Sequence, residues 1–247
     1  MTFDDSWRAV SVVPPLAAGE VHVWCEDLSA ASPWPPADVL SSEERAQATR
    51  MLAPGRREAF VRGRSALRLL VGMYLDIPAA RVAVRLLEKG KPVIDHPGEA
   101  PPLSVSVAHS GSVLAVAVTR AGDVGVDVEN EARTVDRMAI ARRFFTEAES
   151  ASVESLGVSA FFALWAHKEA MLKAAGDGLT VPLSEVEFRI DGRAAPKLRR
   201  VPPSYGTVGD WTTRPLATAP SMAGAIAVRG GISSVHCLRW TGAFVSS

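Results

Sequence analysis

The sequence has few residues of the kinds that mark specialised classes of protein. Only 2 of its 247 residues are cysteines, Cys25 and Cys237, and their wide separation fits neither a metal site nor a disulfide framework. We expect two free, buried thiols, which suit a reducing compartment. Charge of one sign is not in excess, because Lys plus Arg and Asp plus Glu number 27 each. A general attraction to nucleic acid or to an anionic membrane is therefore not expected.

Long apolar runs are also scarce. The uncharged stretch at residues 100–119 has the length of a membrane span, but Pro, Ser, His and Gly interrupt it and its apolar residues alternate as in strands. The N-terminal residues are acidic and lack the apolar segment of a secretory signal. With 47% hydrophobic and 22% charged residues, the chain has the composition of a globular protein with a substantial core. We expect a cytoplasmic protein.

Helical and strand-like patterns occur in blocks rather than in strict alternation, which predicts the α+β class. Ser41 followed by Glu44 forms a capping box that opens a helix toward Met51. Another helix is expected to begin near Phe161 and to stop at Gly176. Further helices are expected at residues 56–75 and 136–150, a loop at residues 199–203, and strands at residues 21–24, 82–87, 103–107, 113–119, 124–129, 186–190, 222–228 and 235–240.

The helix at residues 161–175 carries the first functional candidates. Trp165, Glu169 and Lys173 are spaced four residues apart and therefore lie on one face of the helix. Taken alone, this spacing is typical of a surface ion pair beside a half-buried tryptophan.

An acidic pair upstream changes that interpretation. In the strand at residues 124–129, Asp127 and Glu129 point the same way, about 7 Å apart along the strand. Val126 and Val128 are expected to point into the core. Neighbouring carboxylates repel unless a cation or a proton lies between them, and Mg²⁺ prefers such oxygen ligands. The alternative is a solvated acidic strand end, but apolar residues lead directly into this pair.

Basic residues gather in the helix at residues 56–75. Arg57, Arg64 and Arg68 follow one another at seven- and four-residue intervals, with Arg56 and Arg62 nearby. Such a stripe is either a solvated face or a clamp for a phosphate-bearing ligand, because guanidinium groups match phosphate oxygens.

Two expected turns add candidates for ligand binding. The turn Gly90-Lys91-Pro92 exposes a lysine, and the turn Ala108-His109-Ser110-Gly111 exposes a histidine beside a flexible glycine. Each signal is weak by itself, since an exposed lysine or histidine is usually only solvated.

The four segments in order resemble the motifs of the 4′-phosphopantetheinyl transferases of the larger, monomeric (Sfp-type) class. Residues 125–129 (Gly-Val-Asp-Val-Glu) and 165–173 (Trp-Ala-His-Lys-Glu-Ala-Met-Leu-Lys) resemble the signature pair of that family, and residues 90–92 and 109–111 its upstream motifs. The resemblance spans roughly residues 56–179. It implies two similar α+β halves, residues 1–122 and 123–247, related by pseudo-twofold symmetry with the active site in the cleft between them.

The resemblance also implies an activity. Enzymes of this family transfer the 4′-phosphopantetheine group of coenzyme A to a serine hydroxyl of an apo acyl or peptidyl carrier protein, with Mg²⁺, and release 3′,5′-ADP. Members of this class often serve polyketide or nonribosomal peptide biosynthesis. No nucleic acid or membrane partner is implied.

Residue by residue, the resemblance assigns the metal ligands to Asp127, Glu129 and Glu169. It assigns the binding of coenzyme A to Lys173, to Lys91 and His109, and to the arginine helix with Arg56, Arg64 and Arg68. Catalysis would rest on Glu169, Asp127 and Lys173, and we assign to Glu169 the role of base for the serine, directly or through a metal-bound water. Many members carry Ser where this chain has Ala108, so a hydroxyl contact to the ligand is missing.

Two other functions are compatible with these residues. A non-catalytic homologue would bind coenzyme A or dock a carrier protein without transfer, and a generic Mg²⁺-dependent phosphatase or nucleotidyl enzyme would hydrolyse coenzyme A without a carrier. For the carrier we expect a basic and apolar surface on the helix at residues 136–150, with Arg142, Arg143, Phe144 and Phe145, although both phenylalanines also suit a core.

Overall fold

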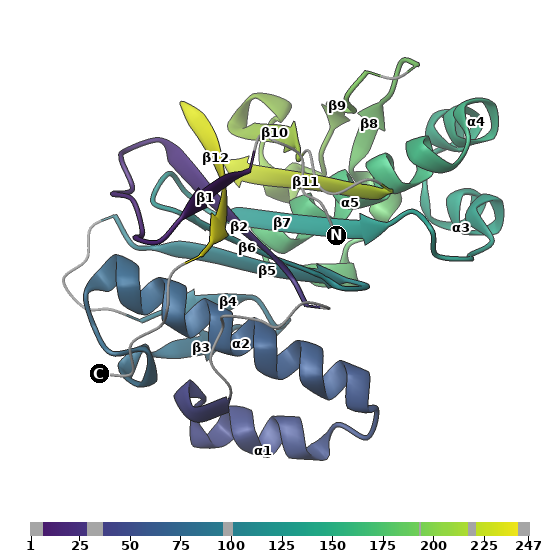
Figure 1. The fold of residues 1–247 in the computed structure, drawn as a ribbon. Coiled ribbons are helices and arrows are strands. Elements are labelled where there is room, and N and C mark those ends of the chain that lie inside the picture. Colours follow the sequence, from purple (N-terminus) through teal and green to yellow (C-terminus); the bar gives the residue numbers. More distant parts are fainter. Residues whose placement is uncertain (1–6, 29–36, 96–100, 193, 217–220, 242–247) are drawn as a thin grey trace.

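The computed structural model describes residues 7–28, 37–95, 101–192, 194–216 and 221–241 (Figure 1). Over these residues, two sheets form the centre of the molecule. The larger sheet contains, in spatial order, β1 (Arg8–Val10), β12 (Ser234–Trp240), β2 (Glu20–Asp27), β6 (Val113–Thr119) and β5 (Ser104–Ser110). The smaller sheet contains β10 (Trp211–Pro215), β11 (Met222–Arg229) and β7 (Val124–Asn130), paired antiparallel.

Serine side chains join the two sheets where β5 lies beside β7. The hydroxyls of Ser104, Ser106 and Ser110 accept hydrogen bonds from the backbone N–H groups of residues 124, 126 and 130, at 3.2, 3.1 and 3.0 Å. Alternate residues of a strand share a face, so one face of β5 is aimed at the edge of β7. This bridge fixes the register between the strand that bears His109 and the strand that bears Asp127.

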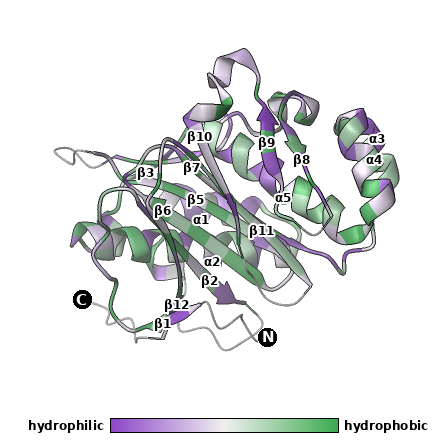
Figure 2. Cartoon of the chain, turned by 90° about the horizontal axis from the view of Figure 1, so that it is seen from above, coloured by the Kyte–Doolittle hydropathy of each residue, from purple (hydrophilic) through white to green (hydrophobic). Residues whose placement is uncertain are grey.

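Helices cover the outer faces of both sheets. On the larger sheet lies α2 (Pro54–Leu75), and α1 (Ser42–Arg50) packs on the far side of α2. On the smaller sheet lies α5 (Val158–Ala175), flanked by α3 (Arg137–Phe144) and α4 (Glu147–Leu156) (Figure 1). The hairpins β3–β4 (Val84–Leu86, Pro92–Ile94) and β8–β9 (Glu187–Arg189, Lys197–Arg200) complete the regular structure that is described. Central strands are hydrophobic along their length, whereas β9 is hydrophilic (Figure 2).

Three hydrophobic cores alternate with the layers. One lies between α2 and the larger sheet and includes Leu67 and Val116, and a second lies between the sheets and includes Val23 and Val126. The third packs α5 against the alanines of β11. As expected, Val126 and Val128 are buried in the core, and the α+β class is confirmed.

The segments expected at residues 41–51, 56–75, 113–119, 124–129, 222–228 and 235–240 are present within two residues of their expected bounds. The capping box of α1 forms as expected, with Ser41 N donating to Glu44 and Glu44 N donating to the Ser41 hydroxyl. Neither cysteine forms a disulfide within the described part of the chain; Cys25 is buried as expected, whereas Cys237 is only half-buried.

Three local expectations were wrong. The single helix expected at residues 136–150 is two helices, because Thr146 forms a capping box with Glu149 and starts α4. His109 and Ser110 lie in β5 rather than in a turn, since they pair with Leu114 and Val113 of β6. Residues 199–200, expected in a loop, belong to β9.

Residue 122, the expected boundary between two halves, lies between β6 and β7. Strand β12, which follows that boundary in the sequence, belongs to the larger sheet. It pairs parallel to both β1 and β2. The division into residues 1–122 and 123–247 stays a prediction. Among the described residues, no helix is long and apolar enough to cross a membrane.

Candidate active site

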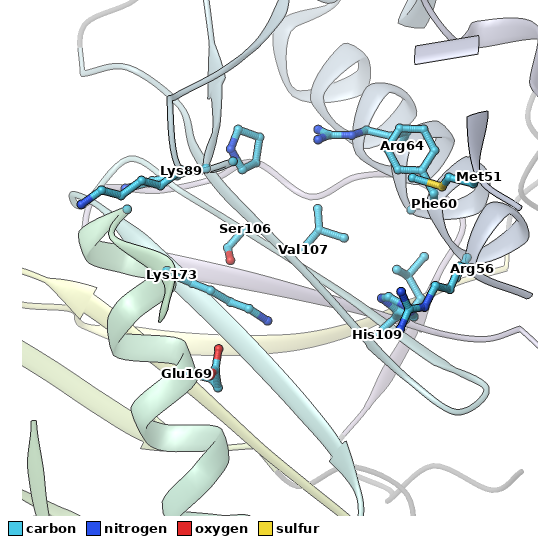
Figure 3. A pocket seen from close by; sticks show the side chains of 18 of the residues that line it. Met51, Arg56, Phe60, Arg64, Lys89, Ser106, Val107, His109, Glu169 and Lys173 are labelled. Carbon is cyan, nitrogen blue, oxygen red and sulfur yellow. The ribbon is translucent and has the colours of Figure 1, made fainter. Parts of the chain in front are cut away.

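A cavity of about 1080 Å³ opens between α2 and α5 (Figure 3). Four parts of the chain line it: the end of α1 with the first half of α2, the β3–β4 turn, strand β5, and the C-terminal half of α5. The polar lining residues are Arg56, Arg64, Lys89, Lys91, Ser106, His109, Glu169 and Lys173. The wall therefore carries mainly cationic groups, with one carboxylate, Glu169.

A glycine sets the contact between α5 and β7. A Cβ on Gly125 would lie 1.9 Å from the carbonyl oxygen of Ala170 and 2.5 Å from the amide nitrogen of Ala174, so only glycine lets the helix sit this close to the strand. Asp127 follows Gly125 on the same face of β7, so the close approach of α5 brings Lys173 to Asp127. Lys173 Nζ lies 2.6 Å from Asp127 Oδ1 and 3.1 Å from the carbonyl oxygen of Val126.

Asp127 is buried, and its second oxygen, Oδ2, has no hydrogen-bond partner among the described residues. The pKa of Asp127 is raised to about 7, mainly by burial and also by the nearby carboxylates of Glu129 and Glu169, while Lys173 opposes the shift. A buried carboxylate oxygen without a partner is suited to bind a cation.

Glu129 lies two residues further along the same face, as expected. Its Oε2 atom accepts a hydrogen bond from the Ser110 hydroxyl at 3.2 Å and pairs with Arg133 at 2.7 Å. Arg133 was not among the expected site residues, although its spacing of four residues from Glu129 is a visible signal.

Glu169 reaches the cavity from α5, one helical turn before Lys173 (Figure 3). Its pKa is raised by burial and by the charge of Glu129, while Lys173 opposes the shift. The charges of Asp127, Glu129 and Glu169 act on one another, but of the three side chains only Glu169 lines the cavity. Their ligand atoms do not all lie within 4.8 Å of one another in the structure, which has Lys173 and Arg133 paired with two of them.

The basic groups come from separate segments. Arg56 and Arg64 line the cavity from α2, and the Arg64 guanidinium lies 5.7 Å from the centre of the Phe60 ring. Lys91 follows Gly90, whose φ of +90° favours glycine in the turn. Lys91 Nζ donates to Asp123 at 2.5 Å and to the carbonyl oxygen of Ala174 at 2.6 Å, so it also joins the turn to the end of α5.

His109 lies on the face of β5 that packs against α2; its own side chain is exposed and borders the cavity. Its pKa is lowered by burial and by the nearby charge of Lys173, while Glu129 opposes the shift. A neutral imidazole in this position can donate one hydrogen bond and accept another.

Comparisons with known proteins show to which family the chain belongs. The family model described as the 4′-phosphopantetheinyl transferase superfamily matches residues 123–219. The 4′-phosphopantetheinyl transferase HetI of Nostoc sp. is 31% identical over 229 residues, covering 87% of this chain and 90% of the relative. The chain belongs to the 4′-phosphopantetheinyl transferase family.

Two further similarities are more distant. The 4′-phosphopantetheinyl transferase psf-1 of Bacillus pumilus is 32% identical over 167 residues, which cover 64% of this transferase and 68% of the relative. The structure of Helicobacter pylori holo-[acyl-carrier-protein] synthase in complex with coenzyme A overlaps 42% of this chain and 97% of its own, with 21% identity and a TM-score of 0.36. The latter likeness is too weak to inform the fold.

One expected binding residue of the transferase lies elsewhere. Arg68 is 3% exposed and does not line the cavity. Its Nε donates to Glu44 at 2.6 Å and its Nη1 donates to the carbonyl oxygen of Val82 at 2.8 Å. The spacing placed Arg68 correctly on the same side as Arg64, but α1 covers that part of α2 and supplies the carboxylate.

Ala108 is buried in the core between the sheets, on the face of β5 that carries Ser104, Ser106 and Ser110. Ser106 on this face lines the cavity, whereas Ala108 does not. The expected loss of a hydroxyl contact to the ligand stays a prediction.

Several lining residues were not predicted. Phe60 lies one turn from both Arg56 and Arg64, so helical spacing was a sufficient signal for it. Lys89 precedes Gly90 and pairs with Asp177 at 2.7 Å. Ser106 carried no signal in the sequence, because its place beside β7 depends on how the sheets meet.

Proposed function

We propose that the transferase binds coenzyme A in the cavity between α2 and α5. It there moves the 4′-phosphopantetheine group to a serine hydroxyl of an apo acyl or peptidyl carrier protein, in a Mg²⁺-dependent reaction that releases 3′,5′-ADP. The observation that carries the proposal is that one cavity combines cationic side chains from three segments with the carboxylate of Glu169, and that one of these cations, Lys173, is paired with the buried Asp127.

Coenzyme A carries a pyrophosphate and a 3′-phosphate, which require several cations at separate positions. We assign Lys173, Lys91 and His109 to its phosphate groups and Arg56 and Arg64 to the 3′-phosphate. Arg68 is left out, because its guanidinium is buried and paired with Glu44. Phe60 offers an apolar surface beside the arginines.

The residues present fit a divalent cation. Asp127, Glu129 and Glu169 would hold Mg²⁺, and the orphaned Asp127 Oδ2 atom supports this assignment. When bound, the cation neutralises charge on the pyrophosphate. Lys173 and Arg133, which pair with two of these carboxylates, can exchange them for ligand phosphates.

The chemical step needs a base, because a serine hydroxyl is a poor nucleophile. We assign this role to Glu169, because a raised pKa makes its carboxylate a stronger proton acceptor than an ordinary one. Glu169 takes the hydroxyl proton as the serine oxygen bonds to the phosphorus that bears the pantetheine arm. The bond from that phosphorus to the bridging oxygen of the pyrophosphate breaks, and the electron pair leaves with 3′,5′-ADP, next to Lys173.

The carrier protein would dock on α3, at the outer side of the carboxylate cluster. Arg142, Arg143 and the 38% exposed Phe144 remain available for this surface. Phe145 does not, because it stacks on Phe161 in the core with ring centres 5.7 Å apart. We further propose a monomer in the cytoplasm that serves polyketide or nonribosomal peptide biosynthesis, built from two pseudo-symmetric halves at residues 1–122 and 123–247.

The test uses coenzyme A, Mg²⁺ and a panel of apo carrier proteins, with the mass gain of the carrier as the readout. Asp127→Ala, Glu129→Ala and Glu169→Ala should each abolish the mass gain, whereas Asp95→Ala, which removes an exposed carboxylate paired with Arg85, should keep it. Full activity of Asp127→Ala in the presence of a chelator would refute the metal assignment. Absence of transfer by the wild type would favour a non-catalytic homologue.

A further inference from the structure

A second cluster of potential metal ligands lies away from the cavity, where β2 and β12 pair in parallel. Glu20 and His22 come from β2, and His236 comes from β12, directly opposite His22 in the register. The ligand atoms of these three side chains all lie within 4.8 Å of one another. In the described part of the chain, no other set of three histidine, cysteine, aspartate or glutamate side chains has its ligand atoms this close together.

Both imidazoles point their Nε2 atoms at the same carboxylate. His236 Nε2 lies 3.3 Å from Glu20 Oε1, and His22 Nε2 lies 3.5 Å from Glu20 Oε2. Ligands of a tetrahedral zinc ion at 2.0–2.1 Å are about 3.3 Å apart, so these separations match a coordination shell. The two rings are perpendicular, with centres 5.4 Å apart, which keeps them from blocking each other.

A second layer of hydrogen bonds orients His22. Its Nδ1 atom lies 2.6 Å from the hydroxyl oxygen of Tyr74 on α2, and Trp24 Nε1 donates to the same oxygen at 3.0 Å. A tyrosine oxygen can accept both hydrogen bonds, which leaves the Nε2 lone pair of His22 free for a metal. Metal-binding histidines commonly have their second nitrogen fixed in this way.

We propose that Glu20, His22 and His236 form a binding site for a divalent transition metal of the zinc class. The site joins the last strand of the chain to β2 across the centre of the larger sheet. Glu20 and His236 are half-exposed, with 23% and 39% of their side-chain surface accessible, so an ion can enter and water can complete its coordination.

The charges around the site are compatible with a cation. Glu20 contributes the carboxylate of the cluster, and both histidines can offer a ring nitrogen to a metal ion. Arg8 on β1 acts against a cation, but it is exposed. Tyr74 lies ten residues beyond Arg64 on α2, which separates this site from the cavity by about 15 Å along the helix.

The experiment measures how many equivalents of Zn²⁺ the full chain retains in competition with a chromogenic chelator. His236→Ala and Glu20→Gln should each retain one equivalent fewer than the wild type. Glu187→Gln, which removes a half-buried carboxylate from β8, serves as the matched control and should retain as many equivalents as the wild type. Any zinc bound by the carboxylates near the cavity contributes equally to the wild type and to the variants, so it does not affect the difference in equivalents between them.

A second readout is thermal unfolding with Zn²⁺ at a hundredfold excess over its dissociation constant. The ion should raise the Tm of the wild type by about 5 °C more than that of His236→Ala. Equal zinc retention and equal Tm shifts in the wild type and in both site variants would overturn the proposal. They would leave Glu20 and the two histidines as a hydrogen-bonded cluster only.

Discussion

Two lysines on α5, five residues apart, show how one helix separates stability from ligand binding. Lys168 and Lys173 each form an ion pair with a carboxylate, at 2.8 Å to Glu149 and at 2.6 Å to Asp127. A step of five residues turns the helix by about 140°, so the two side chains leave it on different sides. The first points into a core and the second into the cavity.

The surroundings of Lys168 are closed. Lys168 and Glu149 are both 0% exposed, and Lys168 Nζ also donates to the carbonyl oxygens of Leu183, at 2.9 Å, and Val186. Glu149 in turn accepts hydrogen bonds from Phe188 N and Thr146 N. Every hydrogen of the ammonium group has a partner, so this pair connects α4, α5 and the start of β8 and has no capacity for a ligand.

The surroundings of Lys173 are open. Its side chain is 30% exposed and borders the cavity, and its carboxylate partner has an unpaired oxygen. Lys173 can leave Asp127 for a ligand phosphate with little loss of free energy, because water reaches the pair. Separating the fully buried pair of Lys168 and Glu149 would instead leave a buried charge without a partner. The difference between the two lysines therefore lies in what surrounds them, not in residue type or helix position.

The largest effect is expected from Lys168→Ala. This change leaves the Glu149 carboxylate buried without its cation and should lower the free energy of unfolding by about 3–5 kcal/mol. Urea denaturation of the variant and the wild type measures the loss. The double variant Lys168→Met/Glu149→Gln removes both charges but keeps a side-chain oxygen as a hydrogen-bond acceptor, and should therefore recover part of the loss. A double variant as unstable as the single one would contradict the pairing argument.

A smaller effect, on binding rather than folding, is expected from Lys173→Ala. Loss of a charge-assisted hydrogen bond to a phosphate should weaken coenzyme A binding at least about tenfold. Stability should change little, because Asp127 can take up a proton when its partner is removed. Isothermal titration calorimetry gives the dissociation constant, and an unchanged value would refute the assigned role.

The smallest effect is expected from pH, and it concerns the partner of Lys173. Because the pKa of Asp127 is raised to about 7, the carboxylate is protonated below that pH and must lose its proton to bind Mg²⁺. The apparent Mg²⁺ affinity should therefore fall about tenfold from pH 8 to pH 6. In Lys173→Ala the midpoint should move to higher pH, since Lys173 lowers this pKa in the wild type. A flat profile between pH 6 and 8 would contradict both statements.

Much of the fold could be predicted from local patterns. The capping box at Ser41, the alternation in β6 and the stop at Gly176 each act within a few residues, so the sequence shows them directly. The break between α3 and α4 was missed although Thr146 and Glu149 form the same kind of capping box as Ser41 and Glu44. The break was not recognised because Phe144 and Phe145 continue the helical spacing of apolar residues up to Thr146.

The candidate site divides in the same way. Spacing along one strand and one helix was enough to place Asp127 with Glu129 and Glu169 with Lys173 on common faces, because strand and helix geometry is local. It could not show that Arg68 faces Glu44, that Ala108 faces β7, or that β12 brings His236 to His22 across 214 residues of chain.

The sequence by itself thus determined the class of fold, the family and the pairs of functional residues that share an element. The tertiary structure decided which charges are closed in the core and which border the cavity. Both lysines of α5 are encoded within five residues of each other, but only the packing of α4 and β8 on one side, and of β7 behind Gly125 on the other, distinguishes them. Burial depends on contacts between distant segments, and no local pattern encodes it.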